Sequence, residues 1–185
     1  EVCDPLGVQL GSARQLRQRL ADFDRRVAPT EIVRARGGCV RGIVHDENAW
    51  ALSGHACSGH AGLFGTVTDV LRFGQALLSA LAGQSAWLSH DALWPLLKPR
   101  HGGSLCAGFD GKSPAGSSAG ALSSSRTFGH LGFTGTSLWI DPEADAVGTR
   151  RTNRVHPTRE NNAIRAVHPI VHDQRFALAA GRRGA

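Results

Sequence analysis

The most regular pattern of apolar positions predicts a helix that ends near Leu81. Thr66 or Thr68 can cap its first turn, and Asp69 places a carboxylate where the helix dipole favours negative charge. The apolar stripe at helical spacing consists of Val70, Phe73, Leu77 and Leu81.

Three shorter helices are predicted elsewhere. One follows Ser12 and reaches Phe23, because Leu16, Leu20 and Phe23 share a face. A second covers residues 89–97, bent or shortened by Pro95. The last covers residues 161–171, with Ile164, Val167 and Val171 apolar.

Strand composition is concentrated near the C-terminal end. Residues 127–140 read as one strand that stops at the Asp141-Pro142 turn signal. A partner is expected at residues 146–153, although Gly148, Arg150 and Arg151 interrupt its apolar run, and a short strand is predicted at 105–109. Glycine and proline predict long loops over residues 29–65 and 102–126.

Length and composition allow one domain with a core of ordinary size, since 41% of the 185 residues are hydrophobic. The sequence contains no run of 18 apolar residues, so it predicts no membrane span, and the N-terminus has no signal-peptide pattern. The chain contains no Met and opens on Glu1. We therefore expect a piece of a longer protein.

A net charge of +6 raises the possibility of nucleic-acid binding, but its distribution argues against it. Of the 21 basic residues 19 are Arg, spread without a long run, which a coding bias toward Arg, Ala and Gly explains. A denser set of arginines toward the C-terminal end leaves binding of an anionic partner as an alternative. That set is Arg150, Arg151, Arg154, Arg159, Arg165, Arg175, Arg182 and Arg183.

Metal chemistry has weak support. The four cysteines form no Cys-x-x-Cys pair. One cluster of metal-competent side chains falls within sixteen residues, without the tight, repeated spacing of structural zinc sites; its members are His45, Asp46, His55, Cys57 and His60. We predict no metal and no cofactor.

Three segments in order carry a resemblance to a known family. They are Gly42-Ile-Val-His-Asp-Glu-Asn-Ala49, Gly59-His-Ala-Gly-Leu-Phe64, and Phe128-Gly-His-Leu-Gly-Phe-Thr-Gly-Thr-Ser-Leu-Trp-Ile-Asp-Pro142. With Thr152-Asn-Arg-Val-His-Pro157, they resemble the serine beta-lactamase-related family, which includes class C beta-lactamases, DD-peptidases and esterases. The resemblance covers residues 37–173.

That resemblance implies roles for three residues. His130 and Gly132 occupy the family's third active-site motif, His-x-Gly, on a sheet-edge strand. The imidazole would bind near a substrate carboxylate, and Gly132 would leave room for substrate along the strand. The backbone N–H of Phe133 would be one oxyanion-hole donor. A purely structural role for His130 is the alternative.

The family's other two motifs are absent from the sequence. No Ser is followed three positions later by Lys, and there is no Tyr to supply the usual second-motif base. Serine is a poor nucleophile without an adjacent base. By resemblance both motifs precede the Pro5-Leu-Gly7 region, so we expect that the chain is truncated at its N-terminal side. We therefore expect it to be inactive alone, a pseudoenzyme derived from a penicillin-binding-like hydrolase.

The resemblance implies an α/β (α+β) fold, a partial beta-lactamase/transpeptidase-like domain whose antiparallel sheet is flanked by helices. Residues 1–175 would be the C-terminal portion of one domain and residues 176–185 a flexible tail. The complete parent would hydrolyse small amide or ester substrates through an acyl-enzyme, in the bacterial periplasm or cell envelope. Expected partners are such a substrate and a missing N-terminal half. The alternative is a noncatalytic ligand- or partner-binding module.

Structural roles are expected for four other conspicuous side chains. His45 and Asp46 should organise their loop through hydrogen bonds to backbone, and His60 should anchor the loop between Gly59 and Gly62. Trp139 should pack in the core or on the sheet face.

Overall fold

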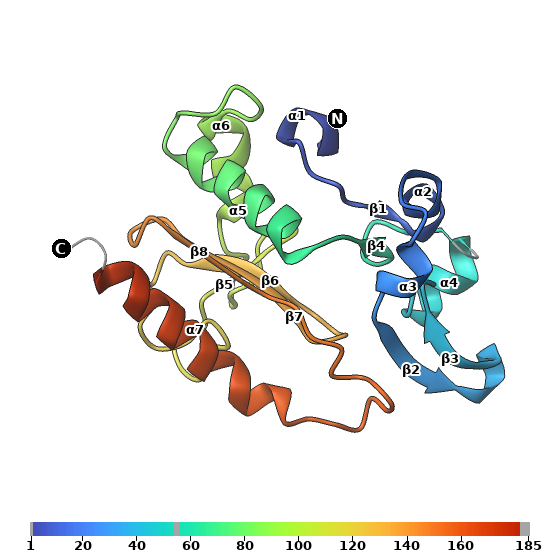
Figure 1. Ribbon diagram of the computed structural model, residues 1–185. Coiled ribbons are helices and arrows are strands. Elements are labelled where there is room, and N and C mark those ends of the chain that lie inside the picture. The colour runs from blue at the N-terminus through green and yellow to red at the C-terminus, as the bar shows by residue number, and fades with distance from the viewer. Residues whose placement is uncertain (1, 54–55, 182–185) are drawn as a thin grey trace.

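The computed structural model describes residues 2–53 and 56–181. Its centre is a four-stranded antiparallel sheet in the order β5 (Asp110–Gly111), β6 (Phe128–Gly132), β7 (Thr136–Asp141) and β8 (Ala146–Arg150). Helix α5 (Val67–Leu81) covers one face of the sheet and helix α7 (Ile164–Gly181) covers the other (Figure 1). The predicted mixture of helices and antiparallel sheet is confirmed.

The single strand predicted at 127–140 is two strands. The turn between β6 and β7 contains Phe133, Thr134 and Gly135, and the Gly135 N–H donates to the carbonyl of Gly132 at 2.9 Å. Gly135 has φ of 99°, a left-handed conformation that favours glycine. The chain therefore reverses where composition alone reads as continuous strand.

Strand β8 ends at Arg150, three residues before its predicted end. Among the described strands only β7 pairs with it, so β8 is an edge strand. An edge position explains why its sequence is less apolar than expected for a central strand.

The α5 face of the sheet holds the larger core. Its buried members are Leu77, Ala80, Leu93, Phe128 and Ile140. Close approach of α5 depends on Gly74, where an added Cβ would lie 2.6 Å from Val147 Cγ1. Thr66 caps this helix, since its hydroxyl accepts the Asp69 N–H while Asp69 bonds back to the Thr66 backbone. The predicted α5 helix and its cap are confirmed.

The α7 face holds a second cluster, formed by Ala119, Trp139, Ala146 and Phe176. Trp139 is 2% exposed, which confirms its expected core position. Because Phe176 is buried here, α7 continues to Gly181 through residues where a flexible tail was predicted. The helix also begins three residues later than predicted, at Ile164. Residues 182–185 lie outside the described residues.

The N-terminal part contains several short elements. They are α1 (Cys3–Leu6), β1 (Gly11–Ser12), α2 (Ala13–Arg19), α3 (Phe23–Arg26), β2 (Pro29–Val33), η1 (Arg34–Arg36), β3 (Gly38–Arg41), α4 (Glu47–Ser53) and β4 (Leu63–Phe64). The hairpin β2–β3 and helix α4 occupy most of the predicted 29–65 loop, so that prediction was wrong. The predicted helix at 12–23 breaks into α2 and α3 at Leu20. Elements this short carry too few residues to show a period.

Between α5 and the sheet, Ser89 caps α6 (His90–Leu93), and the 3₁₀ turn η2 (Trp94–Leu97) follows. The predicted bend at Pro95 is therefore a change of helix type. The strand expected at 105–109 is reduced to one bridge between Leu105 and Asp110. No helix in the described part of the chain has the length and hydropathy to cross a bilayer.

Candidate active site

Strand β6 holds His130 and Gly132, and the turn that follows it holds Phe133, the third residue predicted for the site. Strand β5 pairs only with Phe128 and Gly129, so the segment 130–132 lies along an open edge of the described sheet. The His130 side chain is exposed, Gly132 is half-buried, and Phe133 in the following turn is 57% exposed. A ligand can therefore reach this part of the strand.

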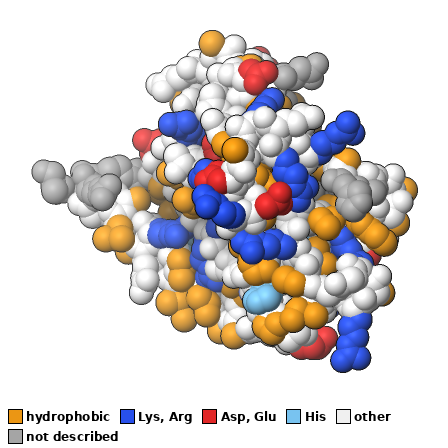
Figure 2. Space-filling view, turned by 45° about the vertical axis from the view of Figure 1, so that its right-hand side comes forward, with side chains coloured by type: hydrophobic (Ala, Val, Ile, Leu, Met, Phe, Trp, Pro, Cys, Tyr) orange, Lys and Arg blue, Asp and Glu red, His pale blue; other side chains and the backbone are white. Residues whose placement is uncertain are grey.

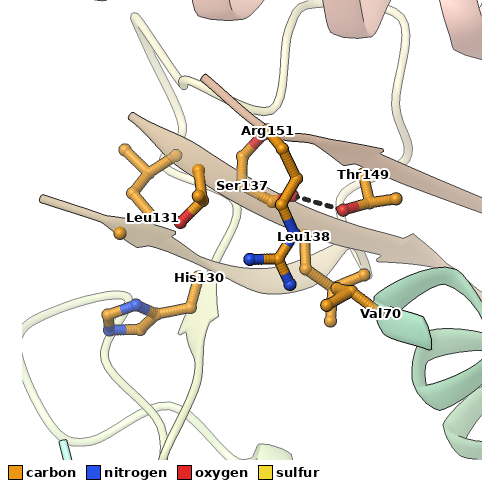
Figure 3. Close-up of a pocket in the computed structure, with 9 residues that line it drawn as sticks. Val70, His130, Leu131, Ser137, Leu138, Thr149 and Arg151 are labelled. Carbon is orange, nitrogen blue, oxygen red and sulfur yellow. Dashed lines mark hydrogen bonds between the residues drawn. The ribbon is translucent and has the colours of Figure 1, made fainter. Parts of the chain in front are cut away.

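Gly132 lines both a small cavity and a larger groove. A small cavity of about 180 Å³ lies on the α5 face and is lined by His130, Gly132 and Arg151 among others (Figure 3). A groove of about 850 Å³ is lined by Gly132, Phe133 and residues of the N-terminal part. His130 faces the small cavity and Phe133 the larger groove. An added Cβ at Gly132 would lie 2.1 Å from Thr136 Oγ1, so a larger residue here would displace the Thr136 hydroxyl.

The Phe133 ring is held between cationic and aromatic groups. It stacks on His45, with ring centroids 5.7 Å apart and planes inclined by 18°. The guanidinium of Arg154 lies 4.5 Å from its centroid and that of Arg159 lies 5.6 Å away. Arg154 Nε also donates to the Phe133 carbonyl at 2.8 Å. These contacts hold the ring and the turn in place.

A buried carboxylate lies behind this aromatic stack. Glu31 accepts hydrogen bonds from the Nε and backbone N–H of Arg159, and its Oε2 lies 2.9 Å from His45 Nε2. Arg159 also pairs with Glu47. Arg36 donates to the His45 carbonyl at 2.8 Å. Residues from four distant segments are joined in this way around the mouth of the groove.

Electrostatics agree with the geometry. The Arg159 guanidinium, followed by its backbone N–H and by His45, lowers the pKa of Glu31 to about 2 against the opposing effect of burial. The same pairing raises the pKa of Arg159. Glu31 therefore remains a carboxylate at neutral pH and holds both partners.

A second hydrogen-bonded chain lines the groove opposite the sheet. His60 Nε2 lies 3.0 Å from Asp46 Oδ1, and His60 Nδ1 lies 2.9 Å from Ser58 Oγ. Asp46 Oδ1 also accepts the Ala49 N–H at the start of α4, which confirms its expected contact with backbone. His60 anchors the loop as predicted, whereas the imidazole of His45 bonds to Glu31 and not to backbone.

The candidate metal cluster is not assembled in the part of the chain that the structure describes. Among residues 2–53 and 56–181, no three His, Cys, Asp or Glu side chains are grouped to hold an ion. His55 lies outside the described residues.

Several residues at this site have no signal in the sequence. Glu31 falls in a predicted loop, and Arg159 and Arg151 were counted only as members of a basic C-terminal set. Arg154 lies in the Thr152–Pro157 motif, whose resemblance was the one available clue. Glu31 and Arg159 meet across 128 residues of sequence, a contact that local patterns do not report.

The fold and this strand motif define a class of protein, and sequence comparison agrees with it. The beta-lactamase family model matches residues 7–171. The chain belongs to the beta-lactamase family, within its serine beta-lactamase-related branch.

Similar proteins point the same way. A putative D-alanyl-D-alanine carboxypeptidase of Salmonella agona is 34% identical over 127 residues, and that of Salmonella gallinarum is 35% identical. Each alignment covers 66% of this chain and 29% of the relative, so the chain matches less than a third of these curated proteins.

Two solved structures share the fold. A mutant simvastatin synthase of Aspergillus terreus has a TM-score of 0.63 at 16% identity, and covers all of this chain with 50% of its own length. A beta-lactamase of Mycobacterium bovis has a TM-score of 0.50 at 23% identity, over 64% of this chain and 46% of its own. The architecture thus corresponds to about half of a beta-lactamase-like fold.

Proposed function

We propose that the chain supplies the substrate-facing wall of an acyl-enzyme hydrolase that cleaves small amide or ester bonds. The observation that carries the proposal is the open segment 130–132 of β6, where His130 and Gly132 lie beside a cavity and Phe133 is fixed at the mouth of a larger groove. His130 would bind the substrate, and the Phe133 N–H would donate to the developing oxyanion.

The chain alone would not turn over substrate. Its sequence holds neither Ser-x-x-Lys nor a Tyr base. Ser58 lies beside an imidazole, but the His60 side chain is 56% exposed, and water therefore competes for both of its hydrogen bonds. The nucleophile and base would come from a further segment, in the same protein or in a partner chain.

The direct test measures hydrolysis of a chromogenic beta-lactam and a short-chain p-nitrophenyl ester by the purified chain. We expect the rate of the buffer. Turnover that disappears in Ser58→Ala would contradict the proposal and identify the Ser58–His60–Asp46 chain as the nucleophilic site, because no other serine has this arrangement among the described hydrogen bonds. An adjacent upstream reading frame with both missing motifs would favour a divided enzyme.

A noncatalytic binding module is the second candidate. It is favoured by the groove of about 850 Å³, which the described residues form although the sequence holds no Ser-x-x-Lys motif. This candidate predicts saturable ligand binding with no turnover even after an Ser-x-x-Lys segment is supplied in trans. Restored turnover that His130→Ala then reduces would reject it.

A further inference from the structure

All three carbonyl groups of the turn between β6 and β7 are hydrogen-bonded to one short segment that follows β8. The Phe133 carbonyl accepts a hydrogen bond from Arg154 Nε at 2.8 Å, and the Thr134 carbonyl accepts the Arg154 backbone N–H at 3.0 Å. The Gly135 carbonyl accepts the Thr152 hydroxyl at 2.8 Å. Thr152 and Arg154, which we call the turn-binding pair, therefore fix the orientation of three successive peptide groups.

The turn-binding pair packs directly against the backbone of the turn. A Cβ added at Gly135 would lie 2.2 Å from Thr152 Oγ1 and 2.7 Å from Arg154 Cγ. Gly135 also has a φ of 99°, which other residues rarely adopt. The absence of a side chain at Gly135 thus allows both the conformation of the turn and its close contact with the pair.

Arg154 is itself held at its other end. Its Nη1 donates to the carbonyl of Arg159 at 2.9 Å and to that of Asn161 at 3.1 Å. Among residues 2–53 and 56–181, no carboxylate forms a salt bridge with Arg154. The printed partners of this guanidinium are backbone carbonyls and the Phe133 ring, so it serves the geometry of the backbone and not an ion pair.

The direction of the Phe133 N–H follows from a bond inside the turn. The Gly132 carbonyl belongs to the same peptide group as this N–H, and it accepts the Gly135 N–H at 2.9 Å. In a trans peptide group the C=O and the N–H point in opposite directions. The Phe133 N–H therefore points away from the turn, and no acceptor in the described part of the chain is hydrogen-bonded to it.

A donor for developing negative charge has to be held in place before the reaction, because reorganisation during the reaction cancels its benefit. The turn has little rigidity of its own. It is flanked by Gly132 and contains Gly135, and Phe133 is 57% exposed. The turn-binding pair supplies the rigidity that the sequence of the turn lacks.

We propose that Arg154 is a positioning residue for the reaction. Together with Thr152, it fixes the turn so that the Phe133 N–H is presented to the oxyanion. Arg154 acts through Phe133 in this role and needs no contact with the substrate. The inference rests on the proposed function and adds to it a residue that prepares the oxyanion donor.

The experiment compares the full chain with Arg154→Ala, Arg154→Lys and Thr152→Val. Arg154→Lys keeps the charge and one donor group, whereas Thr152→Val keeps the shape and the charge of the pair and loses only the bond to Gly135. Arg126→Ala is the matched control. Arg126 is exposed and its guanidinium lies 5.5 Å from the ring centroid of Trp94, so this variant also removes an arginine from an aromatic ring.

The first measurement is backbone ¹⁵N relaxation of residues 133–135, which needs no nucleophile. We expect order parameters of about 0.85 in the full chain and in Arg126→Ala, and values below about 0.6 at these three positions in Arg154→Ala. Arg154→Lys and Thr152→Val should give intermediate values. Circular dichroism establishes that each variant is folded, and if Arg154→Ala does not fold, Thr152→Val decides by the same measurements.

The second measurement separates positioning from a purely structural role. Each variant is complemented in trans with a segment that carries Ser-x-x-Lys, and hydrolysis of the p-nitrophenyl ester is followed. We expect Arg154→Ala to lower kcat at least about tenfold with KM changed less than about twofold, because a displaced oxyanion donor weakens binding of the transition state and not of the substrate. Arg154→Lys should recover part of kcat.

Two outcomes overturn the inference and leave the proposed function intact. One is a turn that stays rigid in Arg154→Ala. The other is an unchanged kcat in a variant whose turn has become mobile, or an equal loss of kcat in Arg126→Ala. Absence of turnover by the complemented unmodified chain contradicts the proposed function, and it rejects the catalytic role of Arg154 even where the relaxation data show that Arg154 orders the turn.

Discussion

The imidazole of His45 stacks on the ring of Phe133, with centroids 5.7 Å apart, and its Nε2 lies 2.9 Å from the carboxylate of Glu31. The position of the turn after β6 thus depends on a buried acid in strand β2, 102 residues earlier in sequence. Arg159 closes the arrangement by bonding to the same carboxylate. The turn at the wall of the site is therefore tied to the N-terminal elements through Glu31 and His45.

Glu31→Ala should lower the free energy of unfolding by about 2–4 kcal/mol, because it leaves His45 and Arg159 without their shared acceptor in a site where Glu31 is 6% exposed. Urea unfolding followed by tryptophan fluorescence measures the change. Asp24→Ala is the control, since its pair with Arg17 is largely exposed, and it should cost much less. Equal losses in the two variants would contradict the central role of Glu31.

The lowered pKa of Glu31 also predicts that the stability of the fold decreases in acid. Its pKa in the folded chain is about 2, below its ordinary value, so the stability it contributes is complete above about pH 4.5 and declines as the pH falls toward 2. The difference in unfolding free energy between the chain and Glu31→Gln should therefore shrink across that window. A difference that stays constant from pH 5 to pH 2.5 would show that the carboxylate charge is not what stabilises the network.

The buried His172 gives a second dependence of stability on pH, in a higher pH range. Burial, with help from Arg175, His168 and Arg150, lowers the pKa of this histidine to about 4. The unfolded chain then binds a proton that the folded chain does not between about pH 6.5 and 4, so stability falls as the pH falls through that range. His172→Phe should flatten this part of the stability curve, measured by urea unfolding at half-unit pH steps. The Ser137 hydroxyl, which lies 2.9 Å from His172 Nε2, loses a partner in this variant at every pH.

Sequence patterns predicted the elements whose residues are numerous enough to show a period. Helix α5 was placed correctly because a 15-residue amphipathic stretch has its own cap in Thr66 and Asp69. The turn at Gly135 and the hairpin β2–β3 were missed, since their pairing is decided by backbone geometry and by partners elsewhere in the chain. The motif His130-x-Gly132 lies on strand β6 of the candidate site, but nothing local indicated that Glu31 and Arg159 lie behind it.

Most of the basic side chains are scattered over the surface, which agrees with the interpretation of the positive charge as coding bias. Figure 2 shows Lys and Arg side chains dispersed over the visible face with acidic ones among them. Arg150 is different, because it is 9% exposed and its Nη1 is buried without a partner. Burial lowers the pKa of this guanidinium, with Arg175 adding to the effect.

Arg150→Leu should therefore raise the free energy of unfolding by about 1–3 kcal/mol, since a shorter but apolar side chain replaces a buried unpaired charge. Arg14→Leu, at an exposed position of α2, is the control and should change stability by no more than about 0.5 kcal/mol. Thermal unfolding of both variants measures the difference. Destabilisation by Arg150→Leu would mean that the guanidinium has a stabilising partner.

Gly129 is required where β6 pairs with β7 opposite Trp139. A Cβ at this position would lie 1.9 Å from the carbonyl oxygen of Leu138 and 2.8 Å from a ring carbon of Trp139. The first contact is with backbone, so it is relieved only by displacing β7, which carries Ile140 and Trp139 into the two cores. Gly129→Ala should therefore cost about 3 kcal/mol or more, by the mechanism of overpacking at a site that cannot yield.

Gly59→Ala is the matched control, because its added Cβ would meet nothing within 4 Å. It should unfold at nearly the same urea concentration as the unmodified chain, whereas Gly129→Ala should unfold at a much lower one or remain insoluble. Similar midpoints for the two variants would mean that the strands separate easily at this point. In that case the edge that carries His130 would not be held rigidly enough to act as the wall of a binding site.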